Sequence, residues 1–411
     1  MTPHGPAASP TRLTHHRSFV LFWCARTSTN GAYMMQGVAV GWQIYDLTNN
    51  PLDLGLVGLI QFIPLVAMSI IAGQVLDLFD RRVIAGVCQV GKALAALSLA
   101  VGTAQGWLGR EAMFAILFLS GTARAFEIPT MHALLPGIVP TTLLPRAIAA
   151  SASAQQTAVI CGPSIGGLMY ALGPTTVYAT CALIFIAASV LISLIHVAPR
   201  TEERRPITLE TLFAGFRYIR SRPIILGAIS LDLFAVLLGG VTALLPIYAR
   251  DILAAGPWAL GLLRSAPAVG ALVASIVLAH RAIGGSAGRI MFVAVGMFGL
   301  ATLMFGLSTS IALSFLALMV YGASDAVSVV IRQSLVLLRT PHDMLGRVMA
   351  VNSMCTGSSG TLGEFRAGVV AAWLGAVPAV LMGGFGAIIV MVVWMWVFPQ
   401  LRRVDKLAPQ A

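Results

Sequence analysis

The chain has 411 residues, of which 58% are hydrophobic and only 10% are charged. Soluble domains carry roughly 25% charged residues, so the composition excludes an ordinary soluble protein. The formal net charge is +11, but the 26 Lys and Arg residues are scattered as singles and pairs without interleaved aromatic residues. We therefore expect no nucleic acid partner. The five cysteines lie in apolar segments with no C-x-x-C pair, so neither a disulfide framework nor a metal site is expected.

Long apolar runs recur along the whole chain. The first six cover residues 19–45, 54–76, 83–106, 112–138, 147–170 and 175–196, and the second six cover 224–248, 258–280, 290–306, 310–337, 348–373 and 376–399. A bilayer span needs about 20 apolar residues, and these runs are too long for barrel strands. The first run has no signal-peptide cleavage site, so we expect it to remain in the protein. The sequence therefore predicts an all-α membrane protein with twelve transmembrane helices.

The basic residues predict how the spans face. Alternate connections hold eighteen Lys and Arg residues, whereas the opposite set holds only Arg110 and Arg250. Because cytoplasmic loops are enriched in Lys and Arg, both termini are predicted to be cytoplasmic, in a bacterial-type inner membrane.

One long polar connection divides the chain. Residues 1–196 are expected to form an N-terminal six-helix bundle, 197–222 a cytoplasmic linker, and 223–411 a C-terminal six-helix bundle. Within the linker, apolar residues from Leu209 to Ile219 recur at helical spacing and arginines occupy the other face. This pattern is typical of an amphipathic helix on the membrane surface, and a plain linker helix is the alternative.

The two halves contain an internal repeat. At an offset of 201 residues, glycines of the fourth and fifth spans fall on glycines of the tenth and eleventh, as Gly121 on Gly322 and Gly167 on Gly368. An offset of 206 aligns the tripeptide 54–56 with 260–262. Two six-helix halves in parallel repeat are a transporter architecture. The same offsets place Arg124 on Asp325 and Arg26 on Asp232, so these opposite charges could attract across the seam between the halves.

A motif between the second and third spans resembles the signature of the major facilitator superfamily. Its residues are Gly73, Asp77, Arg81 and Arg82, with Asp80 where the superfamily usually has glycine. This resemblance implies a gate on the cytoplasmic side.

The fifth span resembles the motif of the exporting, antiporter branches of this superfamily, through Gly162, Pro163, Gly166 and Gly167. Its physical content is a helix with one bare face and a proline that removes a hydrogen bond; a packing helix without bearing on transport direction is the alternative. Three further segments, 123–129, 231–234 and 363–368, resemble the enterobactin-exporter-like and drug-efflux subgroup.

Charged residues inside spans are costly and mark functional sites or buried partners. Those well inside the predicted spans are Arg26, Lys92, Arg124, Glu127, Asp232, Arg264, Asp325, Arg332, Glu364 and Arg366. The resemblance implies a cavity lined by the first, fourth, seventh and tenth spans, which makes Arg26, Arg124, Glu127, Asp232 and Asp325 the cavity candidates.

A proton carrier must lose and regain its charge, which a buried carboxylate near a cation can do and an arginine cannot. Asp232, Asp325 and Glu127 are therefore the candidates for proton coupling, with Arg26 and Arg124 as their charge partners. For each carboxylate, a structural ion pair is the alternative. Arg124 and Glu127, three residues apart, can neutralise each other, and Glu364 beside Arg366 is expected to be structural.

The sequence thus predicts a secondary active transporter, a proton-coupled antiporter that exports a siderophore-like or lipophilic drug-like molecule. We expect a monomer without cofactors, whose partners are a small-molecule substrate, protons and the lipid bilayer. A nutrient importer of the same fold that works as a proton symporter is one alternative. A membrane enzyme or receptor that does not transport is another, but the sequence contains no ATP-binding loop and no H-E-x-x-H motif.

Overall fold

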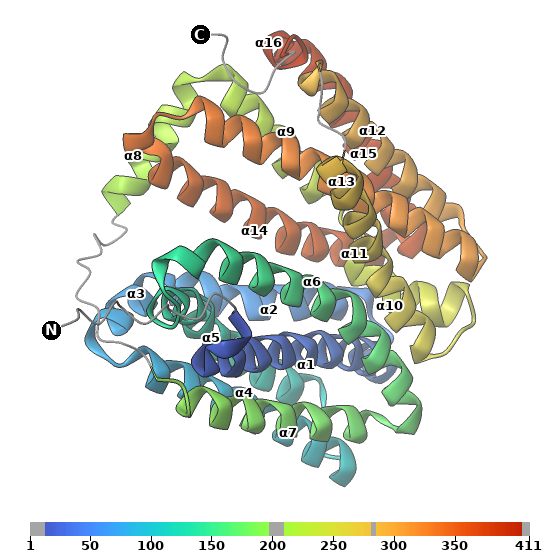
Figure 1. The fold of residues 1–411 in the computed structure, drawn as a ribbon. Helices are drawn as coiled ribbons and strands as arrows, with labels where there is room; N and C mark the ends of the chain where they lie inside the picture. The colour runs from blue at the N-terminus through green and yellow to red at the C-terminus, as the bar shows by residue number, and fades with distance from the viewer. Residues whose placement is uncertain (1–12, 197–208, 281–284, 405–411) are drawn as a thin grey trace, which may run out of the picture.

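The computed structural model describes residues 13–196, 209–280 and 285–404, and within these ranges every regular element is helical. The N-terminal half (blue to green in Figure 1) packs below the C-terminal half (lime to red). The first half contains η1 (Leu13–His15), α1 (Arg17–Thr48), α2 (Pro51–Ala67), α3 (Ser69–Leu78), α4 (Arg81–Gln105), α5 (Arg110–Leu134), η2 (Leu135–Gly137), η3 (Thr141–Leu143), α6 (Leu144–Met169), η4 (Tyr170–Leu172) and α7 (Pro174–Ser193).

The second half also consists of helical spans, and its first span is interrupted. It contains α8 (Leu209–Ser221), α9 (Pro223–Gly239), η5 (Thr242–Leu244), α10 (Leu245–Ile247), η6 (Tyr248–Ile252), α11 (Pro257–His280), α12 (Ala287–Leu307), α13 (Ile311–Arg339), α14 (His342–Leu374), α15 (Ala376–Val397) and α16 (Pro399–Arg402). Twelve spans result when α2 is joined with α3 and α9 with the short helices to Ile252. The predicted two-bundle, twelve-span fold is therefore confirmed.

Two spans predicted as single helices are broken. The second span is interrupted at Met68, between α2 and α3, four residues after Pro64. The seventh span stops at Gly239 and resumes as short helical pieces. The pair Gly239-Gly240 and the following Pro246 explain this interruption, since neither residue type favours a helix interior.

Eight of the described helices are long and apolar enough to cross a membrane by length and composition alone. The spans outside that set are α1, α2 with α3, α6 and α14. Three of them lie along the seam between the halves, where α2 packs against α14 and α6 packs against α11. Helix α2 is apolar and is outside that set only because it has 17 residues, whereas α11, which faces the same seam, belongs to the set.

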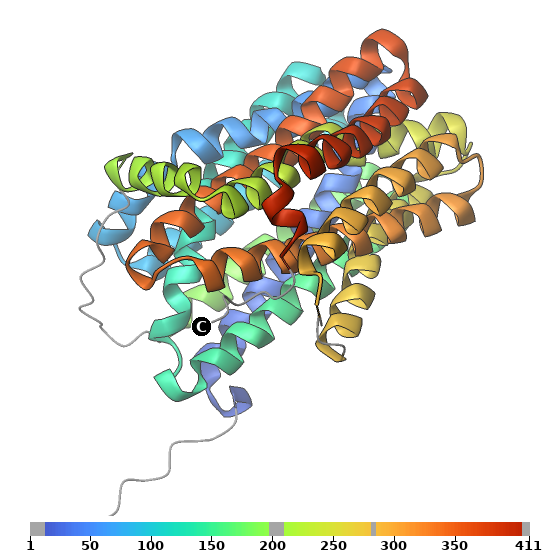
Figure 2. The ribbon, with the colours of Figure 1, turned by 90° about the horizontal axis from the view of Figure 1, so that it is seen from above.

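The bundle has two ends. Because twelve spans alternate in direction, α1 begins and α15 finishes at the same end, which we call the termini side; the opposite end is the far side. At the termini side Ser18 donates a hydrogen bond to the carbonyl of His196, which ties the beginning of α1 to the end of α7. Seen from above in Figure 2, the C-terminal half (lime to red) lies in front of the N-terminal half, and the long helices run between these ends.

Close glycine contacts join the halves towards the far side. A Cβ on Gly55 of α2 would lie 3.2 Å from the Cα of Gly368 of α14, and a Cβ on Gly261 of α11 would lie 3.1 Å from the Cα of Gly167 of α6. The sequence repeat relates Gly55 to Gly261 and Gly167 to Gly368, so these two contacts are symmetry equivalents. The repeat is thus a repeat of packing as well as of sequence.

The linker is described only from Leu209 onwards, and residues 197–208 lie outside the described part of the chain. Helix α8 packs against the first turns of α14, where a Cβ on Gly215 would lie 2.7 Å from the carbonyl oxygen of Arg347. Ile219 is buried in this contact, whereas Phe216 on the same helix is 55% exposed. Part of the apolar face therefore covers the C-terminal half, and Phe216 remains free to contact lipid.

Candidate functional site

A cavity of about 290 Å³ lies at the seam between the two halves. Helices α1, α2 and α5 line it from the first half, and η5, α10, α11 and α14 line it from the second. Its charged lining residues are Arg124, Arg264 and Glu364, and Tyr33 and Gln61 add polar groups. A larger groove of about 590 Å³ lies on α3, α4 and α5, but no charged residue lines it. The seam cavity is therefore the candidate binding site.

Arg124 is the one predicted cavity charge that lines this cavity. Its guanidinium carbon lies 3.8 Å from the ring centroid of Tyr33, a cation–π contact between α5 and α1. The Tyr33 hydroxyl in turn donates a hydrogen bond of 2.8 Å to Gln61 on α2. Three helices of the first half are thus joined around the arginine.

Arg264 reaches the cavity from the other half. It projects from α11 onto the bare backbone of α1, where it donates a hydrogen bond of 2.7 Å to the carbonyl oxygen of Gly37. A Cβ on Gly41 would lie 3.5 Å from the same guanidinium. The two glycines leave the flat surface against which the guanidinium lies.

Glu364 on α14 is the single acid among the cavity-lining residues. Thr242 donates a hydrogen bond of 2.5 Å to its Oε1 atom. A Cβ on Gly58 of α2 would lie 3.1 Å from its Oε2 atom, so this carboxylate also meets the other half. The sequence predicts a structural role for Glu364 beside Arg366, and the side chain of Arg366 lies beside Gly383 of α15.

Asp232 and Asp325 lie away from the seam cavity, inside the second half. They share a small pocket of about 10 Å³ with Ser324 and Ser328, a volume at the limit for one water molecule. The Ser328 hydroxyl is buried and has no hydrogen-bond partner among the described residues. These residues bring α9 and α13 together around a polar space.

Arg332 is the basic member of this cluster. Its Nη2 atom lies 3.1 Å from Oδ2 of Asp232, and the two side chains are 1% and 5% exposed. Its Nη1 atom donates hydrogen bonds to Asn352 at 2.6 Å and to Thr356 at 3.0 Å, both on α14. Asp232 pairs with Arg332 and shares its pocket with Asp325, so the cluster has two carboxylates and one guanidinium, and one proton would neutralise it.

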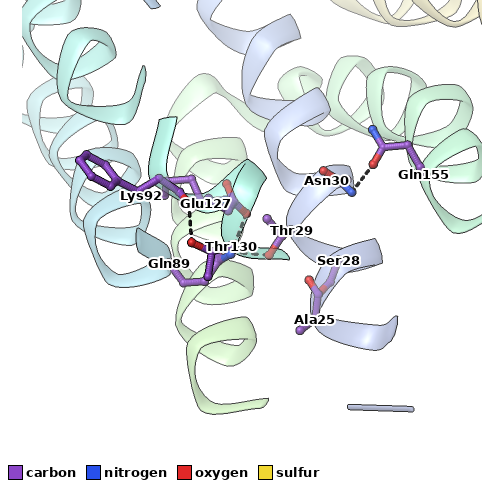
Figure 3. Close-up of polar contacts among 10 residues, drawn as sticks. Ala25, Ser28, Thr29, Asn30, Gln89, Lys92, Glu127, Thr130 and Gln155 are labelled. Carbon is purple, nitrogen blue, oxygen red and sulfur yellow. Dashed lines mark hydrogen bonds and ion pairs between the residues drawn. The ribbon is translucent and has the colours of Figure 1, made fainter. Parts of the chain in front are cut away.

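Glu127 lies in a separate polar network of the first half, which Figure 3 shows in close-up. Lys92 on α4 approaches Oε1 of Glu127 at 2.7 Å, and the side chains are 2% and 9% exposed. Gln89 donates a second hydrogen bond of 2.8 Å to the same oxygen, and Thr29 on α1 donates to Gln89 at 3.1 Å. Helices α1, α4 and α5 are joined through one buried ion pair, and Glu127 does not line the seam cavity.

Arg26 does not line the seam cavity either. Its guanidinium carbon lies 5.9 Å from the ring centroid of Phe22, one turn earlier on α1. The described ion pairs do not include the two pairs expected to attract across the seam, which are Arg26 with Asp232 and Arg124 with Asp325. Each buried pair instead forms within one half, where it need not break when the halves move relative to each other.

The motif between the second and third spans also forms its contacts within the first half. Arg81 donates a hydrogen bond of 3.1 Å to the carbonyl of Ala133, and Arg82 donates one of 3.1 Å to the carbonyl of Ile195. Gly73 has open space around its Cα, and the side chain of Asp77 lies outside the description.

Asp80 explains one departure from the superfamily pattern. Its Oδ1 atom accepts a hydrogen bond of 2.8 Å from the backbone N–H of Arg82, so it caps the N-terminus of α4. The Arg82 side chain also donates to this carboxylate, and these bonds hold the pKa of Asp80 below its usual range.

The fifth-span motif lies where α6 meets both halves. A Cβ on Gly162 would lie 2.7 Å from the Cβ of Met34, and one on Gly166 would lie 2.7 Å from the Cα of Met35, both on α1. On the facing side, a Cβ on Gly167 would lie 2.6 Å from the carbonyl of Pro257. The carbonyl of Pro163 is the nearest atom to a Cβ on Gly261.

A group of polar contacts, which we call the clasp, joins the two halves at the far side. Tyr45 at the end of α1 donates a hydrogen bond to Asp251 of η6. Arg250 contacts Asp46 at 3.3 Å and donates a hydrogen bond of 3.2 Å to Asn49. With the glycine contacts of α2 and α6, these polar contacts join the two halves at the far side.

The fold and the cavity between its halves define a multi-pass membrane transporter for a small-molecule substrate. The profile of the family described as transmembrane secretion effector matches residues 8–411. The chain therefore belongs to this family, within the major facilitator superfamily.

Relatives and solved structures agree with this assignment. The chain is 25% identical over 415 residues to the enterobactin exporter EntS of Escherichia coli O81 (strain ED1a), covering 97% of this chain and 96% of that protein. EntS of Shigella boydii serotype 18 (strain CDC 3083-94 / BS512) matches with the same identity and coverage.

Among solved structures, a bacterial homologue of the iron transporter ferroportin in an inward-facing state has a TM-score of 0.68 and 19% identity, over 93% of this chain and 99% of that one. A bacterial homologue of the lysosomal transporter Spinster, inward-facing and unoccupied, has a TM-score of 0.70 and 13% identity, over 95% and 96%. At these identities the similarity to solved structures shows the fold alone.

Proposed function

We propose that this protein exports a small organic molecule from the cytoplasm across the inner membrane in exchange for protons. The observation that carries the proposal is the buried cluster of Asp232, Asp325 and Arg332, which holds one more acid than base. A membrane-embedded cluster with this imbalance gains from binding one proton, because a net charge in low dielectric is costly. The cluster lies on α9 and α13, which pack against α14 and α11, and α14 and α11 line the seam cavity, so a movement of α9 or α13 would act on the cavity through these two helices.

Three observations support export as the direction of transport. The eighteen-to-two distribution of basic residues assigns the termini side to the cytoplasm. The clasp and the glycine contacts join the two halves at the far side, so the cavity of this state would exchange with the cytoplasm. The relatives that match over nearly the full length carry the name enterobactin exporter, and enterobactin is therefore the first candidate substrate.

Proton exchange would work through competition. When the cavity faces the cytoplasm, substrate binding would favour release of the proton from the cluster; when it faces the periplasm, a new proton would favour release of the substrate. Arg332 supplies the cation that stabilises the deprotonated cluster, because guanidinium keeps its charge throughout.

Everted membrane vesicles test this proposal. With an acid-inside pH gradient reported by a fluorescent dye, enterobactin should partly dissipate the gradient in vesicles that contain the protein. Asp325→Asn and Asp232→Asn should abolish this response. Glu111→Gln should retain it, because Glu111 is an exposed carboxylate at the far side. Transport of a compound without any proton movement would refute the antiport proposal.

A further inference from the structure

The charges of the seam cavity do not balance. Two arginines and one glutamate line it, which leaves an excess of one positive charge. The described contacts use one of the five N–H donors of Arg264, in its bond to Gly37. They use none of those of Arg124, which contacts the Tyr33 ring through its face. Both guanidinium groups are therefore available to a ligand.

Each half contributes one of these arginines. Arg124 belongs to α5 of the first half and Arg264 to α11 of the second, and both line the same space. A single anionic group bound between them would form charge-assisted hydrogen bonds to both halves at once. Apolar residues such as Val57, Phe62 and Leu117 form much of the remaining wall, which suits the carbon skeleton of an organic acid.

We infer that the seam cavity binds organic anions, held by their acidic group between Arg124 and Arg264, and that Glu364 limits how strongly they bind. This inference rests on the proposal that the seam cavity is the transport site, and it adds the chemical class of the ligand. The cavity volume of about 290 Å³ is near the lower end of ligand pockets, so a compact aromatic acid fits it.

Glu364 provides a second test of the inference, because its effect on anion affinity is opposite to that of the two arginines. Its carboxylate shares the cavity with both arginines, so it repels a bound anion and offers an acceptor to a hydroxyl group of the ligand. Neutralising it should therefore strengthen binding of a simple anion, whereas neutralising either arginine should weaken it. A set of purely structural charges would not give this pattern of signs.

Equilibrium binding of a matched pair of probes tests the inference. 1-Naphthoate and 1-naphthylmethylammonium share one ring system and carry opposite charges. Binding of each to the purified full-length protein in detergent should be measured by isothermal titration calorimetry. The anion should bind at least tenfold more tightly than the cation. Arg124→Gln and Arg264→Gln should each weaken naphthoate binding by about tenfold, the loss of a hydrogen bond to a charged group.

Two further variants complete the experiment. Glu364→Gln should raise the affinity for naphthoate several-fold, and Arg217→Gln, on the exposed surface of α8, should leave it unchanged. Should one arginine variant unfold, the other arginine and Glu364→Gln still decide the result. Equal affinities for the two probes, no saturable binding of either, or a decrease in Glu364→Gln would overturn the inference. Since no gradient is present, loss of proton coupling alone would leave these results intact.

Discussion

Removing one partner of the Lys92–Glu127 ion pair should strongly destabilise the protein. The two side chains are 2% and 9% exposed and 2.7 Å apart, so either charge left alone would be buried without its partner. Breaking a buried pair in this way costs roughly 3–5 kcal/mol. Neutralising an isolated lysine side chain at pH 7 costs about 4.6 kcal/mol, and an isolated glutamate about 3.7 kcal/mol, which sets upper limits on these penalties.

Lys92→Met should therefore cost up to about 3.7 kcal/mol, because the carboxylate left behind can take up a proton. Glu127→Met should cost up to about 4.6 kcal/mol by the corresponding argument for the ammonium group. The double variant Lys92→Met, Glu127→Met should recover most of the loss. It should retain a deficit of about 1 kcal/mol, because Lys92 also lies 4.7 Å from the ring centroid of Phe185.

Unfolding in an SDS titration at pH 7, followed by tryptophan fluorescence, measures these differences. The reasoning requires a coupling energy of several kcal/mol between the two sites in the double-mutant cycle. Additive effects of the two substitutions would refute it.

Two more variants test local features of the fold. Asp80→Ala should cost about 1 kcal/mol of stability through loss of the α4 cap, whereas Asp80→Asn keeps the cap acceptor and should cost less. Because the bonds from Arg82 depress the pKa of Asp80, the stability advantage of the wild type over Asp80→Asn should vanish as the pH falls below about 4. Equal stability of all three proteins at pH 7 in the same titration would contradict the cap. Gly261→Ala should loosen the far-side contact, because its Cβ would lie 2.4 Å from the carbonyl oxygen of Pro163, and amide hydrogen exchange at the start of α11 should rise several-fold. Gly73→Ala is the control, because a Cβ at this position meets open space. Unchanged exchange in Gly261→Ala would contradict the close packing.

Composition and spacing were sufficient to predict the architecture. Each span must be apolar over about 20 residues and satisfy its own backbone, so the number and order of helices follow from the sequence. The breaks in the second and seventh spans were not predicted, although the pair Gly239-Gly240 is a signal for the second of them.

Partners of the buried charges could not be predicted, because they depend on how each helix is rotated about its axis. Arg124 and Glu127 are three residues apart, and mutual neutralisation was one alternative for them, yet positions three apart differ by about 60° in direction. This difference is enough for Arg124 to contact Tyr33 while Glu127 contacts Lys92.

Arg264 was counted among the membrane charges but not assigned to the cavity. Its place there depends on the packing of α11 against the glycines of α1, a contact between segments more than 200 residues apart. The glycines Gly37 and Gly41, four residues apart on α1, are the one sequence signal for a flat surface at this point.

Proton release on substrate binding tests the central claim most directly. Purified protein in weakly buffered detergent solution near neutral pH should release about one proton per bound enterobactin, measured with a pH indicator, since ligands that compete must displace each other reciprocally. In Asp325→Asn the binding should persist and this release should disappear. Binding without proton release in the wild type, or equal release in both proteins, would contradict exchange through the buried cluster.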